Sequence, residues 1–440
     1  MAAPVWTASR ISRSYNDGMI NAASRAAVDG ASWRGPLIRP LYESYCFANL
    51  PSAIERRLTG KGQTNLPPDT LAGLPERCDT VILFFIDAFG WRFFQRYRDK
   101  YPFLRHFVDN GVVSTLTSMF PSTTAAHVTA IHTGVMPGQS GVYEWYQYEP
   151  TLDATILPLP FSLATDKDRD TLLALGFGAD KLFPPANLHQ RLAASGVESF
   201  VMHPNELSRG ATGKALYAAA HTVDYKTLPE ALVRLGEMLG RQRGPAYYFL
   251  YSSDIDTLAH AYGPESDAVD AQADQFLITL ERNFERLLGK RKDAIFILTA
   301  DHGQVEINPK TCVYINEKLP AARRWLRTYA NGETIWPSGS ARDTFWHVRP
   351  EALQEATSAF RDLLKDKAVV VPTDELIAAG FFGPSVSQAF LSRVGNLTVL
   401  PLAGESVWWK VPGRLEQRFF GHHGGLTRQE MEIPMLACRL

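Results

Sequence analysis

Residues of the types that bind metal ions lie in four widely spaced segments of the chain. Each of the first three segments closely follows an apolar run, and the fourth is a late pair of histidines. The residues are Asp87, Asp256 and His260, Asp301 and His302, and His422 and His423. Carboxylate oxygen is a hard ligand and imidazole nitrogen a borderline one, and together they suit divalent metal ions. This distribution suggests a hydrolase with two metal ions.

The elements that must position these residues are predicted to be buried strands. Continuous apolar runs with β-branched and aromatic residues lie at 81–86, 246–252 and 294–299, with shorter ones at 112–113 and 200–202. Such runs are typical of a parallel sheet covered on both faces. Helical patterns alternate with them, the clearest beginning after Ser266. We therefore expect an α/β fold with a doubly wound, mostly parallel sheet flanked by helices, whose sites form at the carboxyl ends of the strands.

Composition places the chain among ordinary globular proteins. Its 440 residues are 45% hydrophobic and 21% charged, with a formal net charge of -1. A chain of this length favours one large domain with an insertion, or two domains. The near-zero charge gives no reason to expect binding to nucleic acid or to anionic membranes. No apolar run approaches the roughly 18 residues of a membrane span, so no span is predicted.

The cysteines and the N-terminal residues bear on the compartment. The four cysteines, Cys46, Cys78, Cys312 and Cys438, fit no zinc-finger spacing and are predicted to be buried free thiols. Free thiols are typical of a reducing compartment. The first residues lack the basic start and apolar core of a secretory signal. We therefore expect a cytoplasmic protein, with export by another route as the alternative.

The chain divides into segments of different character. Residues 1–75, rich in Ser, Arg, Gly and Pro, are predicted to be an N-terminal extension packed on the core. The catalytic core is predicted over 76–302 and 420–440. Between them, 303–419 is rich in Trp, Pro and Gly and is expected to be an inserted cap subdomain. A second loop-rich insert is expected at 139–190.

Hydroxyl groups stand at the start of another predicted helix, within 120–134. Ser122, Thr123 and Thr124 form a turn before apolar residues at helical spacing. A hydroxyl in the first helical turn lies in the positive field of unpaired N–H groups, which suits attack on an anionic phosphoryl group. The alternative is that these residues only cap the helix.

Five stretches together resemble the alkaline phosphatase superfamily and, within it, the type I phosphodiesterase/nucleotide pyrophosphatase family. They occur in the family's order and span most of the chain from residue 80 onward. They are Ile86-Asp-Ala-Phe-Gly90, Phe120 to Gly134, Asp256-Thr-Leu-Ala-His260 with Gly263-Pro264, Thr299-Ala-Asp-His-Gly303, and Gly421-His-His-Gly-Gly425. The resemblance implies an alkaline phosphatase-like core.

The resemblance also implies roles for individual residues. Thr124 falls on the family's nucleophile and is the expected catalytic residue, with Thr123 in reserve. One metal ion is expected to be held by Asp87, Thr124, Asp301 and His302, and the other by Asp256, His260 and His423. This ligand set suits Zn²⁺, with Mn²⁺ as the alternative. The expected reaction passes through a phospho-threonine intermediate.

Several neighbouring residues have open interpretations. His127 could donate a hydrogen bond to the substrate's phosphoryl group or could pack within the helix. Tyr143, with Trp145 and Tyr146, could bind the substrate or could form only the core of the insert. Asp254 is the substitute for Asp256 because alternation would place both on one strand face. Arg342 could contact a substrate phosphate or face solvent.

The function expected from the sequence is hydrolysis of phosphate esters, as a phosphodiesterase or nucleotide pyrophosphatase acting on a small phosphate ester or nucleotide. The same scaffold could instead serve a phosphomonoesterase or a hydrolase of phosphonate or sulfate esters. From another class, the chain could be a catalytically weak metal-containing binding protein. The sequence does not determine the natural substrate or the oligomeric state.

Overall fold

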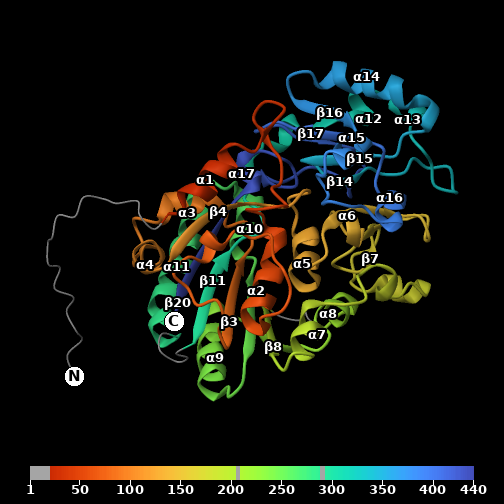
Figure 1. The fold of residues 1–440 in the computed structure, drawn as a ribbon. Coiled ribbons are helices and arrows are strands. Elements are labelled where there is room, and N and C mark those ends of the chain that lie inside the picture. Colours follow the sequence, from red (N-terminus) through yellow and green to blue (C-terminus); the bar gives the residue numbers. More distant parts are fainter. Residues whose placement is uncertain (1–19, 205–208, 288–292) are drawn as a thin grey trace.

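A seven-stranded sheet forms the centre of the molecule (Figure 1). The computed structural model describes residues 20–204, 209–287 and 293–440, so residues 1–19 of the expected N-terminal extension lie outside it. The strands lie in the order β4-β20-β11-β3-β10-β8-β9. Their bounds are β3 (Thr80–Ile86), β4 (Val112–Thr117), β8 (Glu198–Pro204), β9 (His221–Tyr225), β10 (Ala246–Ser252), β11 (Ala294–Thr299) and β20 (Glu432–Arg439).

The sheet is mostly parallel, as its sequence predicts. Strand β3 pairs in parallel with β10 and β11, and β10 and β9 pair in parallel with β8. Strand β20 is antiparallel to both of its neighbours, β4 and β11. Every residue of β3, β10 and β11 is buried, which explains their unbroken apolar sequences. Their carboxyl ends therefore lie side by side at one edge of the sheet.

Helices cover the two sides of this sheet (Figure 1). Helices α2, α5 and α7 pack together on one side, and α4, α9 and α11 pack together on the other. The helices of the core and of the N-terminal extension are α1 (Ala22–Asp29), α2 (Leu50–Thr59), α3 (Trp91–Tyr97), α4 (Pro102–Asn110), α5 (Thr124–Thr133), α6 (Pro137–Ser140), α7 (Leu188–Ala193), α8 (Ala211–Leu216), α9 (Leu228–Arg241), α10 (Asp254–Tyr262), α11 (Asp267–Leu287) and α17 (Arg428–Met431). Short 3₁₀ turns occupy Phe47–Asn49, Pro68–Leu71, Thr171–Leu175 and Ala179–Lys181.

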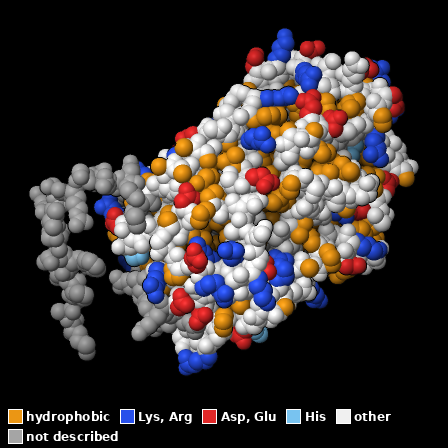
Figure 2. Space-filling model, viewed as in Figure 1, with side chains coloured by type: hydrophobic (Ala, Val, Ile, Leu, Met, Phe, Trp, Pro, Cys, Tyr) orange, Lys and Arg blue, Asp and Glu red, His pale blue; other side chains and the backbone are white. Residues whose placement is uncertain are grey.

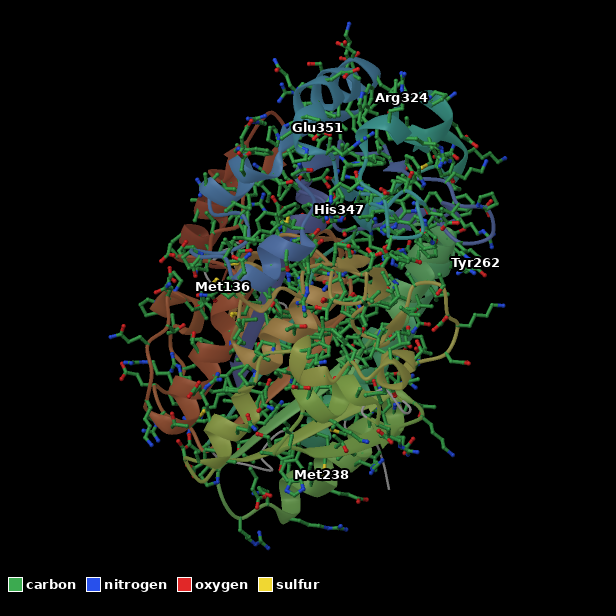
Figure 3. All side chains as sticks on the ribbon, turned by 90° about the vertical axis from the view of Figure 1, so that its right-hand side faces the viewer. Met136, Met238, Tyr262, Arg324, His347 and Glu351 are labelled. Carbon is green, nitrogen blue, oxygen red and sulfur yellow. The ribbon has the colours of Figure 1, made fainter. Side chains whose placement is uncertain are left out.

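A smaller unit built largely from 303–419 stands above the sheet. It contains an antiparallel sheet in the order β14-β15-β17-β16. Its elements are β12 (Val305–Glu306), β13 (Val313–Tyr314), α12 (Ile315–Lys318), α13 (Ala322–Trp325), β14 (Ser338–Ser340), β15 (Asp343–Trp346), α14 (Leu353–Leu364), β16 (Ala368–Pro372), α15 (Thr373–Ala378), α16 (Gln388–Arg393), β17 (Leu397–Pro401) and β18 (Val407–Trp408), with 3₁₀ turns at Pro309–Thr311 and Pro350–Ala352. Figure 3 shows this unit at the top, with Arg324 and Glu351 on it, and the core carrying Met238 at the bottom.

The smaller unit is joined to the rest of the protein by apolar packing and by backbone bonds. The insert after α6 forms a sheet of β5 (Gln147–Glu149), β6 (Ala154–Leu157) and β7 (Ser162–Leu163). Its Tyr146 carbonyl accepts a hydrogen bond from the Gly339 N–H at 2.7 Å. A buried apolar cluster also joins Phe120, Tyr143 and Phe345 with the N-terminal extension, whose strands are β1 (Ser32–Trp33) and β2 (Leu37–Ile38). Strand β19 (Gly421–His422) then pairs with β12 and packs against α10 of the core.

The surface agrees with the near-neutral net charge. On the face drawn in Figure 2, basic and acidic side chains are interspersed, with hydrophobic side chains between them. In the part of the chain that the structure describes, no helix is both long and apolar enough to cross a membrane. The four cysteines are buried and free, as expected from their spacing.

Candidate functional site

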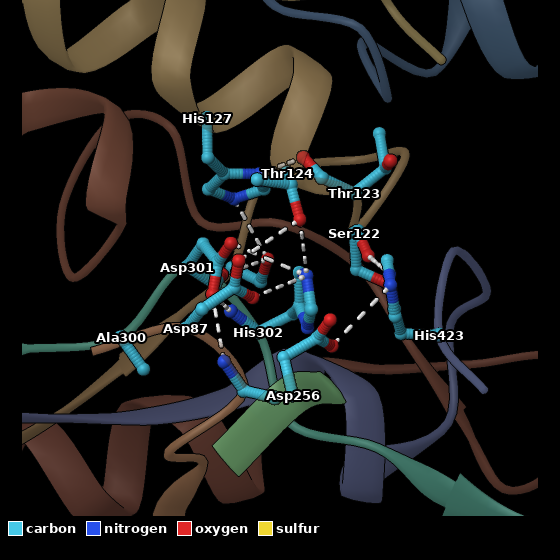
Figure 4. A network of polar contacts seen from close by, with 12 residues as sticks. Asp87, Ser122, Thr123, Thr124, His127, Asp256, Ala300, Asp301, His302 and His423 are labelled. Atoms are coloured by element: carbon cyan, nitrogen blue, oxygen red, sulfur yellow. Dashed lines mark hydrogen bonds and ion pairs between the residues drawn. The ribbon is translucent and has the colours of Figure 1, made fainter. Parts of the chain in front are cut away.

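Three carboxylates meet because three neighbouring strands end at the same edge of the sheet. Asp87 directly follows β3, Asp301 lies just beyond β11, and Asp256 lies in the first turn of α10, which begins after β10. Figure 4 shows their side chains converging with those of Thr124 and His302. The strand order places β3 between the other two strands, so Asp87 lies at the centre of the group.

The loops beyond β3 and β11 approach each other closely. A Cβ atom on Gly90 would lie 2.7 Å from the Cα atom of Gly303, so a larger residue would force the two loops apart. In the first loop Ala88 has a φ of 61°, a left-handed conformation that is uncommon for alanine. This turn directs the Ala88 N–H to Asp301 Oδ1 at 3.1 Å. The loop conformation therefore fixes the orientation of the Asp301 carboxylate.

The histidines share a hydrogen-bonding pattern that fixes their tautomers. The Nδ1 atoms of His260, His302 and His423 lie 2.8, 3.1 and 2.9 Å from the backbone carbonyls of Gly421, Gly303 and Ser122. A carbonyl can only accept, so each Nδ1 carries a proton and donates it. Each Nε2 then presents its lone pair to the site, as in histidines that ligate metals.

Each of these Nε2 atoms faces a carboxylate oxygen. His302 Nε2 lies 3.2 Å from Asp301 Oδ2 and 3.5 Å from Asp87 Oδ1. His260 Nε2 and His423 Nε2 lie 3.4 and 3.8 Å from Asp256 Oδ1. Burial holds the pKa of His302 and His423 well below the ordinary value, so these rings are neutral. Lone pairs and carboxyl oxygens in such proximity form a donor set that a divalent cation can bind.

The carboxylates also show the need for positive charge. Burial raises the pKa of Asp87 well above its ordinary value, and the neighbouring Asp301 and Asp256 add to the effect. Burial, with Asp256 contributing, raises the pKa of Asp301 to about 7. Asp87 Oδ1 and Asp301 Oδ2 are buried and accept no hydrogen bond from the described residues. Two donor groups lie close enough to hold an ion, Asp87–Asp301–His302 and Asp256–His302–His423, with ligand atoms within 4.8 Å of one another.

The structure thus brings together all the residues expected to bind metal, and His302 lies between the two donor groups. Its ring stacks on that of His423 at 3.6 Å between centroids, with an interplanar angle of 13°. The sequence assigned His302 to one ion only, whereas its ring belongs to both donor groups. His260 lies outside these two groups but reaches Asp256, one helical turn away at i and i+4.

Thr124 stands where the sequence predicts the nucleophile. It is the first residue of α5, and its Oγ1 lies 3.4 Å from Asp87 Oδ2 and 3.3 Å from His302 Nε2 (Figure 4). The N-cap position is occupied by Thr123, whose hydroxyl forms no capping bond. Ser122 instead donates its hydroxyl to the Gly425 carbonyl at 2.8 Å. The hydroxyl that converges with the candidate metal ligands is therefore that of Thr124.

His127 lies on the same helix but behind the site. Its Nδ1 donates to the Thr123 carbonyl at 2.8 Å, and its Nε2 accepts from the Met119 N–H at 3.0 Å. Both nitrogens are thus bonded within the protein, and burial lowers the pKa of this histidine to about 3. Of the two interpretations of His127, the structure supports packing within the protein, because neither ring nitrogen of His127 is left to donate to a substrate.

The structure decides the open interpretations of Tyr143, Arg342 and Asp254. The Tyr143 ring is fully buried, and its hydroxyl donates to the Arg393 carbonyl at 3.1 Å. Arg342 neither contacts a substrate site nor faces solvent, because it is fully buried in a pair with Glu430. Asp254 shares no strand face with Asp256, because residues 254–262 are helical and Asp254 is exposed.

Two residues that sequence reasoning missed hold the carboxylates in place. Tyr251 is the second-last residue of strand β10, and its hydroxyl donates to Asp87 Oδ2. The Gln304 amide donates to Asp256 Oδ1 at 2.5 Å. Tyr251 belongs to an apolar run and looks like a core residue in the sequence. The only sequence signal for Gln304 is its place directly after the Asp301-His302-Gly303 stretch.

A cavity of about 450 Å³ opens beside Asp256, His260 and His423 and extends between the core and the smaller unit. Its walls contain the aromatic side chains of Trp145, Tyr146, Trp408 and Phe419. Trp145 and Tyr146 come from the segment in which the sequence predicted substrate-binding aromatics, although Tyr143 does not line the cavity. The volume and the aromatic lining are within the range of small-molecule binding sites.

Comparisons with known proteins agree with this arrangement. A family model described as type I phosphodiesterase / nucleotide pyrophosphatase matches residues 81–426. Ectonucleotide pyrophosphatase/phosphodiesterase family member 1 from Mus musculus is 22% identical over 303 residues, and the Rattus norvegicus protein of the same name is 22% identical over 295 residues. Each match covers 65% of this chain and 31% of the relative, so the chain spans about a third of the length of these relatives.

Solved structures share the fold. Murine ectonucleotide pyrophosphatase/phosphodiesterase 5, as an inactive variant in complex with AMP, superposes with a TM-score of 0.60 at 14% identity, covering 81% of this chain and 87% of that chain. Phosphonoacetate hydrolase from Sinorhizobium meliloti, in complex with phosphonoformate, gives a TM-score of 0.58 at 17% identity, covering 81% of this chain and 89% of that chain.

Proposed function

The chain belongs to the type I phosphodiesterase/nucleotide pyrophosphatase family, and on this basis we propose that it hydrolyses phosphodiesters or nucleotides through a phospho-threonine intermediate on Thr124. The observation that carries the proposal is the position of Thr124 Oγ1, within 3.4 Å of Asp87 and 3.3 Å of His302 at the start of a helix. The hydroxyl is thus held among the residues that we propose as metal ligands, in a family that is metal-dependent.

The residues present fit two divalent ions, and we propose Zn²⁺, with Mn²⁺ as the alternative. Asp87, Asp301, His302 and Thr124 would hold one ion, and Asp256, His260 and His423 the other, with His302 near both. When bound, such ions stabilise an alkoxide nucleophile and the charge of the phosphoryl group. The unprotonated Nε2 atoms and the orphaned carboxylate oxygens support this assignment.

The chain's own residues would carry the remaining parts of the reaction. Thr124 Oγ1 attacks phosphorus, the bond to the leaving group breaks, and a water molecule then cleaves the phospho-threonine. Asp87 Oδ2 is within hydrogen-bonding range of the Thr124 hydroxyl and orients it for this attack. The helix N-terminus supplies unpaired backbone N–H groups, which favour the added negative charge of the phosphorylated residue.

The cavity supports a substrate larger than a simple monoester. Aromatic walls beside Asp256, His260 and His423 can cover the organic group that a diester or a nucleotide carries beyond its scissile phosphate. The murine structural relative was solved with AMP bound, which agrees with a nucleotide substrate. We therefore place diesters and nucleotides before phosphomonoesters and phosphonate or sulfate esters.

The proposal is tested by measuring how fast the zinc-loaded protein hydrolyses bis-p-nitrophenyl phosphate, a diester, and p-nitrophenyl phosphate, a monoester. Thr124→Ala should lower kcat for the diester by more than about 10³-fold, because the nucleophile is gone. Thr124→Ser keeps a hydroxyl and should keep a covalent intermediate, detected by mass spectrometry after an acid quench. Unchanged activity in Thr124→Ala would refute the nucleophile assignment. An inactive wild-type protein with a full metal complement would instead favour a binding role.

A further inference from the structure

A pocket lined by arginines lies at the end of the sheet opposite to the candidate catalytic site. It has a volume of about 390 Å³, and its walls come from α2 and from the chain between α2 and β3. Strand β3 begins directly after this segment, whereas Asp87 follows the other end of the strand. At about 3.3 Å per residue, the seven residues of β3 span about 23 Å. The pocket is therefore separate from the cavity beside the candidate metal ligands.

Three arginines line this pocket, and backbone carbonyls hold the guanidinium group of each. Arg56 and Arg57 belong to the last turn of α2, and Arg77 lies shortly before β3. The acceptors are the carbonyls of Gly62 for Arg56 at 3.2 Å, of Leu74 and Pro75 for Arg57, and of Leu58 for Arg77 at 3.3 Å. The three positive charges are therefore fixed at the wall of one concave site.

Gly60 provides the space in which Arg77 is seated. It follows the last residue of α2 with a φ of 72°, in the left-handed region that favours glycine. A Cβ atom at this position would overlap the Arg77 guanidinium group. The turn after α2 thus lets Arg77 join the two arginines of the helix at the same pocket.

The positive charge of these arginines has little compensation within the protein. None of the three forms an ion pair with a carboxylate of the described residues. Two acidic residues of the same segments are engaged elsewhere, because Glu55 pairs with Arg191 at 2.9 Å and Asp69 accepts a hydrogen bond from Tyr45 at 2.6 Å. Among the residues that line the pocket, Glu76 alone is acidic. Three guanidinium groups and one carboxylate leave two positive charges uncompensated.

Burial makes this excess of charge unfavourable. It lowers the pKa of Arg57, and the like charge of Arg56 adds to the effect, although Glu76 opposes it. The backbone carbonyls offset only part of the charge, because each carries a partial negative charge. An anion with two negative charges would remove the imbalance.

The hydrogen-bond donors that remain in the pocket belong to the arginines. A guanidinium group has five N–H donors in a planar fork, and the backbone carbonyls occupy only some of them. The hydroxyls of Thr64 and Thr70 also line the pocket, but each donates to a backbone carbonyl. The buried side chains of Leu66 and Leu71 add an apolar wall. The pocket thus combines donors for an anion with a surface for a small organic group.

We propose that this pocket binds a small phosphate-bearing anion, either free phosphate or the phosphate group of a nucleotide. The planar fork of arginine matches phosphate oxygens with two parallel hydrogen bonds, and several forks can share one dianion. A volume of about 390 Å³ is within the range of small-molecule sites, so a compact ligand fits better than an extended nucleic acid. Binding here needs neither metal ions nor Thr124, so this site and the proposed function can fail independently.

The test locates the anion by chemical protection of the arginines in the zinc-loaded full chain. Phenylglyoxal modifies accessible guanidinium groups, and peptide mass spectrometry identifies each modified arginine. Phosphate at about ten times its Kd should slow the modification of the exposed Arg56 and Arg77 about 10-fold, because most of the sites are then occupied. Arg105 is a matched control, because it is exposed and donates to a backbone carbonyl at 3.0 Å but does not line the pocket. Its modification should not change.

Variants test the charge balance, with the phosphate Kd obtained from the protection of Arg56. Arg77→Gln should raise this Kd about 10-fold or more, because a charge-assisted hydrogen bond is lost. Glu76→Gln removes the opposing carboxylate and should lower the Kd about 2- to 5-fold. Arg105→Gln should leave it unchanged. Both pocket variants replace exposed side chains, and thermal unfolding curves like that of the wild type will show that they are folded.

Two probes distinguish free phosphate from an organic phosphate. They are compared in Thr124→Ala, which lacks the proposed nucleophile. AMP should protect Arg56 at lower concentrations than phosphate does if Leu66 and Leu71 cover an organic group. Phosphate should protect at equal or lower concentrations if the ligand is free phosphate. Either result supports a phosphate site.

Three results would overturn the proposal. They are no protection of Arg56 and Arg77 by phosphate or AMP, equal protection by acetate at the same ionic strength, and equal protection of Arg105. Protection in a protein that hydrolyses no phosphodiester would leave the phosphate site standing and refute only the proposed function. Hydrolysis without protection would do the reverse.

Discussion

The Tyr251 hydroxyl should contribute measurably to metal affinity, because it orients the central carboxylate of the site. Tyr251 donates to Asp87 Oδ2, and the two residues are only 7% and 2% exposed. A buried hydrogen bond to a charged group is worth about 1.5–3 kcal/mol. At about 1.4 kcal/mol per factor of ten, its loss corresponds to a decrease of about 10- to 100-fold in metal affinity.

Tyr251→Phe removes this hydroxyl and keeps the ring, and the chain offers a matched control on the same strand. Tyr247 is also a fully buried tyrosine of β10, but its hydroxyl has no hydrogen-bond partner among the described residues. Tyr247→Phe should therefore leave metal affinity unchanged. Zinc affinity is measured by competition with a chromophoric chelator on metal-free protein. Equal affinities of Tyr251→Phe and wild type, or an equal loss in Tyr247→Phe, would refute the argument that this hydroxyl orients Asp87.

Two further predictions concern stability. Arg342→Met should lower the free energy of unfolding, measured in urea, by about 3–5 kcal/mol, because it leaves Glu430 charged and unpaired in the interior. The double variant Arg342→Met/Glu430→Gln should recover part of this loss. A decrease below about 1 kcal/mol in Arg342→Met would contradict a stabilising role of the ion pair. Chelator-treated protein should become less stable as pH rises from about 4 to about 7. These limits are the ordinary pKa of aspartate and the raised pKa of Asp301, and between them the folded state binds more protons than the unfolded state. Asp301→Asn should flatten this dependence in thermal unfolding curves, and a metal-free stability that rises over the same interval would refute the sign.

The inner parallel strands of the central sheet and the candidate metal ligands could be located from the sequence because local patterns encode them. The runs at 81–86, 246–252 and 294–299 correspond to β3, β10 and β11, which are buried along their whole length. Burial on both faces makes a strand apolar at every position, so it is visible without knowledge of its neighbours. Parallel strands then place the residues that follow them at one edge.

The sequence alone was less informative where partners come from distant segments. Strand β20 lies between two neighbours but contains Pro434, a residue uncommon in central strands, and the sequence analysis did not predict it as a strand. Asp254 was expected to share a face with Asp256, but α10 begins directly after β10, and the helix turns the two side chains apart. His302 was assigned to one ion from the sequence, and only the fold shows that its ring stacks on His423 and lies in both donor groups.

What the sequence determined by itself is the set of chemical groups at the site, from Asp87 to His423, because each stands in a motif with a recognisable local pattern. Only the tertiary structure decided which of the other polar residues take part. Tyr251 and Gln304 look like parts of an apolar and a loop segment in the sequence, and Arg342 looks like a surface charge. Their roles follow from burial and from contacts across many residues of chain, which remove water and leave each polar group dependent on the partner that the fold supplies.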